Sequence, residues 1–252
     1  MNNRQKEIVK ILTATHKVKI GELAERMQVS DETIRRDLKQ LESQHLLRRV
    51  HGGAISDTNR SKEIDLSSRK SKNLKEKRAI AKMAASFVED GDSLAIASGT
   101  TTLELVKALE NKKNLTIITN SIDAAVAAME NESTTVYILG GKVRRNGLSI
   151  SGTLTNELMS EFRVDKLFFC GGGISVENGI TDYHVEESML TKTMARVSRT
   201  KIALMDYSKF ALTGMKKICD IQDLDIIVID GNVPIIEQNE LKATGVKVAV
   251  AY

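Results

Sequence analysis

The stretch VSDETIRRDL, residues 29–38, decides how the first part of this chain folds. Ser30 can begin a helix because its hydroxyl can accept a hydrogen bond from a backbone N–H group of the first turn. Asp31 and Glu32 follow in that turn, where the helix dipole favours negative charge. The stretch therefore predicts a helix that starts directly after Ser30.

Hydrophobic spacing divides this predicted helix into two faces. At 3.6 residues per turn, one stripe that can pack on a preceding helix is formed by Ile34, Leu38 and Leu41. The outward face carries Glu32, Arg36 and Lys39, flanked by Thr33 and Arg35. Reading of the major groove needs such a face, since Arg pairs with guanine and Lys meets phosphate. An ordinary amphipathic surface helix fits the same residues, so the flanking sequence has to distinguish the two.

The flanking sequence favours a DNA-binding unit. Residues 5–15 and 20–27 repeat apolar side chains at helical spacing, which predicts two short helices ahead of the one at residue 31. Residues 46–50, LLRRV, predict a strand that enters a tight turn at Gly52 and Gly53. This arrangement predicts a winged helix-turn-helix over residues 1–56, with Arg48 and Arg49 on the sugar-phosphate backbone.

Charge is concentrated at the same end of the chain. Residues 1–82 hold 20 Lys and Arg against 11 Asp and Glu, whereas residues 83–252 hold 17 against 22. The first part therefore carries a formal charge of +9 and the rest −5. This asymmetry indicates nucleic-acid association by one end of the chain, driven by counterion release.

Length and composition allow a second, larger domain. The chain has 252 residues, of which 41% are hydrophobic. Cys170 and Cys219 share no ligand-type spacing with each other or with the four His residues, so we expect no metal site, disulfide or cofactor. With no apolar run near the roughly 20 residues of a membrane span and no signal-like start, we expect a soluble cytoplasmic protein.

A polar stretch rich in Ser, Lys and Arg predicts a linker over residues 57–73, and the hydrophobic pattern of the sequence changes after it. From residue 74, helical stretches alternate with short apolar runs, which predicts an α/β domain over residues 74–252 with a mostly parallel sheet. We expect its strands at residues 94–97, 115–119, 136–139, 166–170, 201–205, 226–229 and 246–250.

Polar and glycine residues gather where these predicted strands end, and ligands of open α/β sheets bind there. After the first strand, SGTTT at residues 98–102 opens a helix whose N–H groups and hydroxyls can bind a phosphate. Asn120, Gly141, Arg144 and Lys209 follow later strands. Each is also an ordinary turn or capping residue, but their recurrence indicates a pocket for a phosphorylated sugar or polyol.

The chain resembles the DeoR-type bacterial transcriptional regulators over nearly its whole length. The matching stretches include VSDETIRRDLKQLE, RRVHGGA, SGTTT, ITNS, LGGKVRR and MDYSKF. The resemblance implies a C-terminal domain related in fold to ribose-5-phosphate isomerase. It also implies a repressor of a sugar or polyol operon that a phosphorylated sugar releases from its operator. The expected DNA contacts are Thr33, Arg35, Arg36, Lys39, Arg48, Arg49 and His51, and the expected effector contacts are Ser98, Gly99, Thr100, Thr101, Thr102, Asn120, Gly141, Arg144, Gly172, Glu187 and Lys209.

The sequence departs from the family pattern at two positions where the family commonly has Asp. These positions are Ala97 and Gly172. The departures predict a pocket poor in carboxylates and leave the identity of the ligand open, with Glu187 as a candidate replacement acceptor.

Two other function classes compete with a regulator. A sugar-phosphate isomerase with a DNA-binding appendage would need Asp206, Glu187 and Lys209 for proton transfer, and we expect no catalysis. A DNA-packaging protein would not need a pocketed domain. We expect a homo-oligomer, a dimer or a tetramer, that couples a phosphosugar site to paired recognition helices on an operator.

Overall fold

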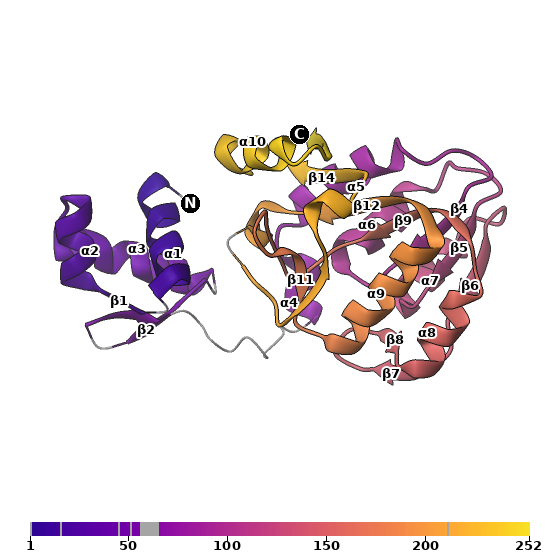
Figure 1. The fold of residues 1–252 in the computed structure, drawn as a ribbon, viewed down its shortest axis with the longest axis horizontal. Coiled ribbons are helices and arrows are strands. Elements are labelled where there is room, and N and C mark those ends of the chain that lie inside the picture. Colours follow the sequence, from indigo (N-terminus) through magenta and orange to yellow (C-terminus); the bar gives the residue numbers. More distant parts are fainter. Residues whose placement is uncertain (1, 16, 45, 51, 56–65, 211) are drawn as a thin grey trace. The chain divides into compact units, whose positions relative to one another are not determined.

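The computed structural model describes residues 2–15, 17–44, 46–50, 52–55, 66–210 and 212–252. The chain divides into two compact units, Met1–Lys62 and Glu63–Tyr252 (Figure 1). We call them the DNA-binding unit and the effector unit, after the roles expected from the sequence, and describe each by itself. Within the described ranges, no helix has both the length and the apolar character that a membrane crossing requires.

The DNA-binding unit is built from three helices and a small antiparallel sheet. Its elements are α1 (Asn3–Thr15), β1 (Lys17–Lys19), α2 (Ile20–Met27), α3 (Asp31–Ser43), β2 (Arg48–Val50) and β3 (Gly53–Ile55). The strand order is β1-β3-β2. The hydrophobic core includes the predicted stripe of Ile34, Leu38 and Leu41, which are fully buried together with Ile8 and Leu12 of α1. The winged helix-turn-helix predicted from the sequence is therefore confirmed.

The effector unit contains a seven-stranded parallel sheet in the order β15-β14-β12-β9-β4-β5-β6. The strands are β4 (Ser93–Ile96), β5 (Thr116–Thr119), β6 (Thr135–Ile138), β9 (Val164–Phe169), β12 (Ser198–Met205), β14 (Ile226–Asp230) and β15 (Lys247–Ala251). Each one overlaps a predicted strand, and no end differs by more than three residues. The expectation of a mostly parallel α/β domain is confirmed.

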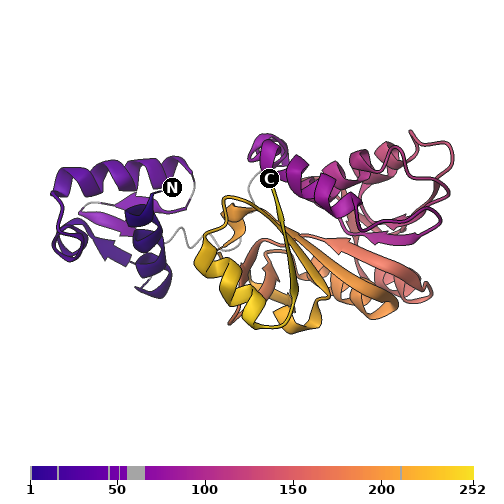
Figure 2. The ribbon, with the colours of Figure 1, turned by 90° about the horizontal axis from the view of Figure 1, so that it is seen from above.

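Helices cover both faces of this sheet (Figure 2). One face packs on α5 (Leu74–Ala85), α6 (Thr100–Ala108) and α7 (Ile122–Ala128), and the other on α8 (Thr153–Ser160), α9 (Val185–Val197) and α10 (Ile235–Ala243). Side chains alternate between the two cores along each strand, so that Leu94 and Ile96 face α5 whereas Ala95 faces α9. Burial on both faces explains why these strands are continuous apolar runs in the sequence.

Shorter elements extend the effector unit beyond the predicted pattern. They are the hairpin of β7 (Lys142–Arg144) and β8 (Ser149–Ser151), the antiparallel strands β10 (Gly173–Ser175), β11 (Gly179–Asp182) and β13 (Lys216–Cys219), and the 3-10 turns η1 (Tyr207–Lys209) and η2 (Ile221–Asp223). These elements were not predicted, because strands of three or four residues are too short to show a hydrophobic period.

The predicted linker over residues 57–73 is wrong in its second half. A helix, α4 (Leu66–Ser71), occupies that part and belongs to the effector unit. The buried ammonium of Lys77 donates hydrogen bonds to the carbonyls of Arg69 and Lys72, the latter at 2.7 Å, and so holds the end of α4 on α5. The helix was not predicted because its sequence is polar. Lys77 holds the end of the helix through backbone carbonyls, and such contacts leave no apolar pattern in the sequence. Residues 57–65 lie outside the described ranges.

Candidate DNA-binding face and effector pocket

The start of α3 has the predicted geometry. The hydroxyl of Ser30 accepts a hydrogen bond from the backbone N–H of Thr33 at 3.3 Å, and Asp31 and Glu32 occupy the first turn. Arg35, Arg36 and Lys39 are exposed on the opposite side from the core. The Arg36 side chain is 81% exposed and lies 3.6 Å from the carboxylate of Glu32. The helix therefore presents a basic face to solvent, as a major-groove reader requires.

The other expected DNA contacts differ in how they are placed. The hydroxyl of Thr33 lies 2.9 Å from that of Ser30, so it takes part in the helix cap. Arg49 bonds to Glu42 twice, through its backbone N–H at 2.8 Å and its guanidinium at 2.7 Å. These bonds lower the pKa of the Glu42 carboxyl. Of Arg48 only the backbone is described, within β2, and His51 lies outside the described residues.

A buried carboxylate that the sequence analysis missed joins α1 to α3. Asp37 is 5% exposed, and its oxygens accept hydrogen bonds from the guanidinium of Arg4 and from the amide of Gln5, the latter at 3.0 Å. The same Gln5 amide donates to Gln40 at 2.7 Å. From the sequence, an acid among basic residues on a predicted helix is expected to be exposed to solvent. Only the position of α1 shows that Asp37 is buried and joins the two helices.

We expect the substitution Arg36→Ala to weaken operator binding by about tenfold, because a well-placed Arg contributes roughly 1–3 kcal/mol of base discrimination. Binding to unrelated DNA should change much less. Fluorescence anisotropy on operator and competitor DNA at one salt concentration measures both. A fall in affinity that is equal on the two DNAs would place Arg36 on phosphate and contradict a base contact.

The effector pocket lies where the order of the parallel sheet reverses. Strands β4 and β9 are neighbours in the sheet. The chain continues from β4 to β5 on one side and from β9 to β12 on the other, so the connections after these two strands lead in opposite directions. Such a switch point opens a crevice for ligands. A Cβ atom at Gly99, directly before α6, would lie 2.2 Å from the sulfur of Cys170, so a glycine is needed where the chain leaves β4.

Twelve residues of the effector unit line this pocket. They are Leu66, Arg69, Lys70, Ser98, Gly99, Thr100, Leu103, Ser121, Asp123, Arg144, Gly147 and Glu187. Five of them are expected effector contacts: Ser98, Gly99, Thr100, Arg144 and Glu187. The structure thus brings together the start of α6, the β7–β8 hairpin and the start of α9.

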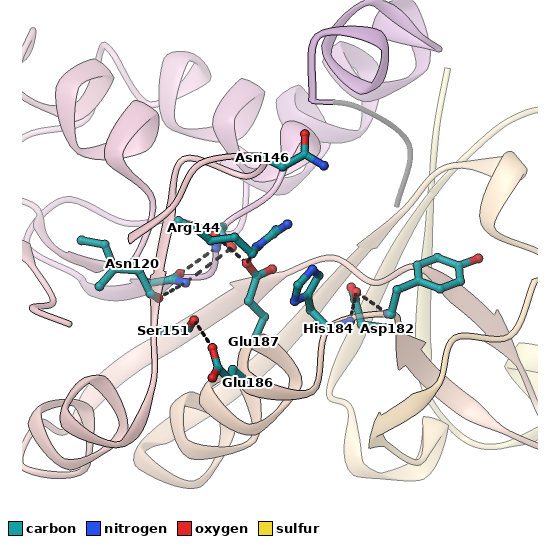
Figure 3. Close-up of polar contacts among 12 residues, drawn as sticks. Asn120, Arg144, Asn146, Ser151, Asp182, His184, Glu186 and Glu187 are labelled. Carbon is teal, nitrogen blue, oxygen red and sulfur yellow. Dashed lines mark hydrogen bonds and ion pairs between the residues drawn. The ribbon is translucent and has the colours of Figure 1, made fainter. Parts of the chain in front are cut away.

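Two ion pairs cross the pocket. The ammonium of Lys70 lies 2.6 Å from the carboxylate of Asp123. The guanidinium of Arg144 lies 2.7 Å from the carboxylate of Glu187 (Figure 3). The hydroxyl of Ser149 also donates to Glu187. The expectation of a pocket poor in carboxylates is therefore wrong, because Asp123 and Glu187 enter it from α7 and α9, away from the two family positions.

The remaining expected contacts do not line the pocket. Thr101 and Thr102 are buried, and the Thr102 hydroxyl donates to the carbonyl of Ala97 at 2.7 Å. Asn120 is also buried, and its amide accepts from the backbone N–H of Ser98 at 2.8 Å and donates to the carbonyl of Ile150 at 3.0 Å. These side chains hold the pocket loops in place.

Three further expected contacts are also absent from the pocket lining. Gly141 is exposed after β6, and Gly172 is buried against the ring of Tyr183. Lys209 is half-buried in η1, next to Asp206. The structure leaves their role in ligand binding a prediction.

The residues that sequence reasoning missed come mainly from α4 and α7. Arg69 and Lys70 fell in the presumed linker, and Asp123 follows the ITNS stretch at the first turn of α7. Asp182 is another, since its carboxylate accepts hydrogen bonds from the backbone N–H groups of Tyr183 and His184 at 2.6 and 3.3 Å (Figure 3). Burial, together with the negative charge of Glu187, raises the pKa of Asp182. In the described ranges, no three His, Cys, Asp or Glu side chains are grouped as a metal site requires.

Asp206 has the opposite electrostatics. Burial opposes its ionisation, but the Lys209 ammonium and hydrogen bonds from Ser208 and Asn73 hold the pKa of this carboxyl below its usual value. A carboxyl with a lowered pKa stabilises the fold above its unfolded pKa, and this contribution is lost as pH falls through the folded pKa.

We therefore expect Lys209→Ala to raise the pKa of Asp206 in the folded protein, so that stability is lost at a higher pH on acidification. Urea unfolding between pH 7 and pH 3 measures this shift. Lys242→Ala, on the exposed end of α10, is the matched control and should leave the profile unchanged. Identical profiles for both variants would contradict coupling between Lys209 and Asp206.

Comparison with known proteins identifies the kind of molecule that these two units form. Residues 4–60 match the DeoR-like helix-turn-helix domain, and residues 72–231 match the DeoR C terminal sensor domain. The chain is thus a DNA-binding transcription regulator with a separate sensor domain. It belongs to the DeoR family.

Two curated relatives and one solved structure are representative. The chain is 34% identical to the uncharacterized HTH-type transcriptional regulator YulB of Bacillus subtilis (strain 168), over 96% of each chain. It is 33% identical to the lactose phosphotransferase system repressor of Staphylococcus epidermidis, over 91% of this chain and 92% of that one. Ribose 5-phosphate isomerase A from Methanocaldococcus jannaschii is 19% identical over 55% of each chain, with a TM-score of 0.41.

Proposed function

We propose that this protein represses an operon for the use of a sugar or polyol and that a phosphorylated sugar releases it from its operator. The family supports the DNA-binding part, and the relative named as a lactose phosphotransferase system repressor supports a sugar-related operon. Binding of the effector, the direction of its effect and action in the cytoplasm are part of the proposal.

The composition of the pocket carries this proposal. Backbone and hydroxyl groups of Ser98, Gly99 and Thr100 stand at the start of α6, where the helix dipole favours a phosphate. Three cationic side chains and two carboxylates complete the polar lining. The cations suit a phosphate group, and the carboxylates suit the hydroxyls of a sugar.

The isomerase alternative gains no support from the candidate base. Asp206 is buried, hydrogen-bonded and depressed in pKa, which makes it a poor proton acceptor at neutral pH. It does not line the pocket, and Glu187 in the pocket is paired with Arg144. We therefore propose a sensor without catalysis.

We also propose that the protein works as a two-fold oligomer. One α3 helix can occupy only one half-site of an operator, and two-fold symmetric pairs of such helices match two half-sites about one turn of DNA apart. Analytical ultracentrifugation of the full chain, with and without operator, distinguishes a dimer from a tetramer.

Fluorescence anisotropy on labelled DNA from the promoter region next to the gene tests the function directly. The complex is titrated at fixed salt with a panel of sugar phosphates and with the matching unphosphorylated sugars. Release by one sugar phosphate, but not by its parent sugar, is the expected result. Specific DNA binding that no member of the panel changes would contradict the proposed effector class.

A further inference from the structure

Helix α4 is the part of the effector unit that adjoins the chain leading to the DNA-binding unit. The DNA-binding unit ends at Lys62, and α4 begins at Leu66. Three of its six residues, Leu66, Arg69 and Lys70, line the effector pocket. The wall of the pocket and the first helix after the connection are therefore the same element.

Among the described residues, polar contacts join α4 to α5, to the β7–β8 turn and to α7. Its end is held by Lys77, and the guanidinium of Arg69 donates to the carbonyl of Asn146, in the β7–β8 turn, at 3.4 Å. The third attachment is the ion pair of Lys70 with Asp123 at the first turn of α7. This third attachment is an ion pair between two side chains that both line the pocket.

The pair is well suited to exchange. The Lys70 and Asp123 side chains are 42% and 27% exposed, so solvent reaches both charges and neither depends on the other to avoid a buried unpaired charge. The Arg144–Glu187 pair on the other side is about 15% exposed and has an additional bond from Ser149. An anion that enters the pocket therefore displaces Asp123 from Lys70 more readily than it displaces Glu187 from Arg144.

We propose that Lys70 leaves Asp123 and binds the anionic group of the effector. Occupancy of the pocket then changes the position of α4, and with it the point where the connection to the DNA-binding unit meets the effector unit. This inference rests on the proposed function and names the element through which it is regulated. It makes Lys70 a ligand-binding residue and Asp123 its competitor. An effector that binds the two arrangements of α4 unequally shifts their populations by that difference in affinity.

The exchange has a signature that a merely structural ion pair lacks. Lys70→Ala removes the cation and should weaken binding of inorganic phosphate by about tenfold, within the range of a charge-assisted hydrogen bond. Asp123→Asn removes the competing charge at nearly constant shape and should tighten phosphate binding several-fold. Lys70→Arg should keep most of the affinity. Phosphate is the probe because it has no sugar hydroxyls for Asp123 to accept from.

Isothermal titration of the full chain with phosphate measures these affinities, and hydrogen exchange of residues 66–71 with and without phosphate reports on α4. Lys107→Ala is the matched control, since Lys107 pairs with Glu104 at 2.7 Å on α6, outside the pocket. Thermal unfolding of each variant shows that it is folded. We expect phosphate to change the exchange of α4 in the wild type and in the control, and not in Lys70→Ala.

The outcomes separate this inference from the proposed function. If the wild type binds phosphate and Lys70→Ala binds it as tightly as the control does, the inference is wrong and the proposed function stands. If Asp123→Asn weakens phosphate binding, exchange is wrong even when Lys70 contributes. If the wild type binds neither phosphate nor any sugar phosphate, the proposed effector itself is wrong.

Discussion

The substitution Gly53→Ala should destabilise the DNA-binding unit by about 3 kcal/mol, at the upper end of the cost of forcing extra atoms into a packed site. A Cβ atom at Gly53 in β3 would lie 2.0 Å from the carbonyl oxygen of Val18. Val18 belongs to β1, the strand that pairs with β3. That oxygen belongs to the backbone, so relief requires β1 and β3 to separate. Because the sheet has only three strands, the wing would be lost with them.

Calorimetry of the full chain and operator binding measure this effect. We expect a lower melting temperature for the DNA-binding unit and greatly weakened operator binding, with sugar-phosphate binding by the effector unit unchanged. Gly21→Ala is the matched control, because a Cβ at Gly21 in α2 meets nothing within 4 Å. Gly21→Ala should leave operator binding intact, and a Gly53→Ala protein that behaves like it would refute the close approach of β1 and β3.

Asp37→Ala should cost about 2 kcal/mol of stability, since it removes the acceptor of the Arg4 guanidinium and leaves the buried amide of Gln5 with Gln40 as its remaining acceptor. Arg4 keeps some access to solvent, which places the expected cost below that of a fully buried broken pair. Urea unfolding followed by circular dichroism measures the change in the free energy of unfolding. Because α1 holds the back of α3, the recognition helix should also lose operator affinity.

Glu32→Ala is the control for this prediction. Glu32 lies on the same helix and faces Arg36 at 3.6 Å, but both side chains are exposed. Removal of such a surface pair should change stability by no more than about 0.5 kcal/mol. Equal stability losses in the two variants would show that Asp37 behaves as a surface acid and would contradict the α1–α3 anchor.

The features predicted correctly from the sequence are those that depend on residues close together in the chain. The cap at Ser30 and the stripe of Ile34 and Leu38 are local features, because capping spans three residues and helical periodicity spans a few turns. The seven parallel strands were readable for a related reason. A strand buried on both faces is a continuous apolar run whatever its neighbours are.

The effector pocket was predicted only in part, because its lining residues come from segments that are far apart in the sequence. The stretch at residues 98–100 lies at the start of α6 and signals an anion site by its own composition. Its partners Lys70 and Asp123 come from two other helices, and nothing in the sequence around them distinguishes them from surface charges. Glu187 of a third helix was expected at the site as a replacement acceptor, but its pairing with Arg144 was not. Asn120 and Thr102 were expected to contact the effector, and in the structure their side chains bond to the neighbouring loops.

The amino-acid sequence alone was enough to predict the elements of this protein: a capped basic helix in a winged unit, and a parallel sheet whose first strand is followed by the turn SGTTT at the start of a helix. These follow from periodicity, capping and burial, which act over a few residues. Only the tertiary structure decided that Asp37 is an internal anchor, that residues 66–71 form a wall of the pocket, and that Asp123 and Lys70 meet there. The physical reason is that an ion pair or a buried hydrogen bond forms only when its atoms are within a few ångström of each other. Lys70 and Asp123 are 53 positions apart in the sequence, and they come that close only because the folded sheet brings their helices together.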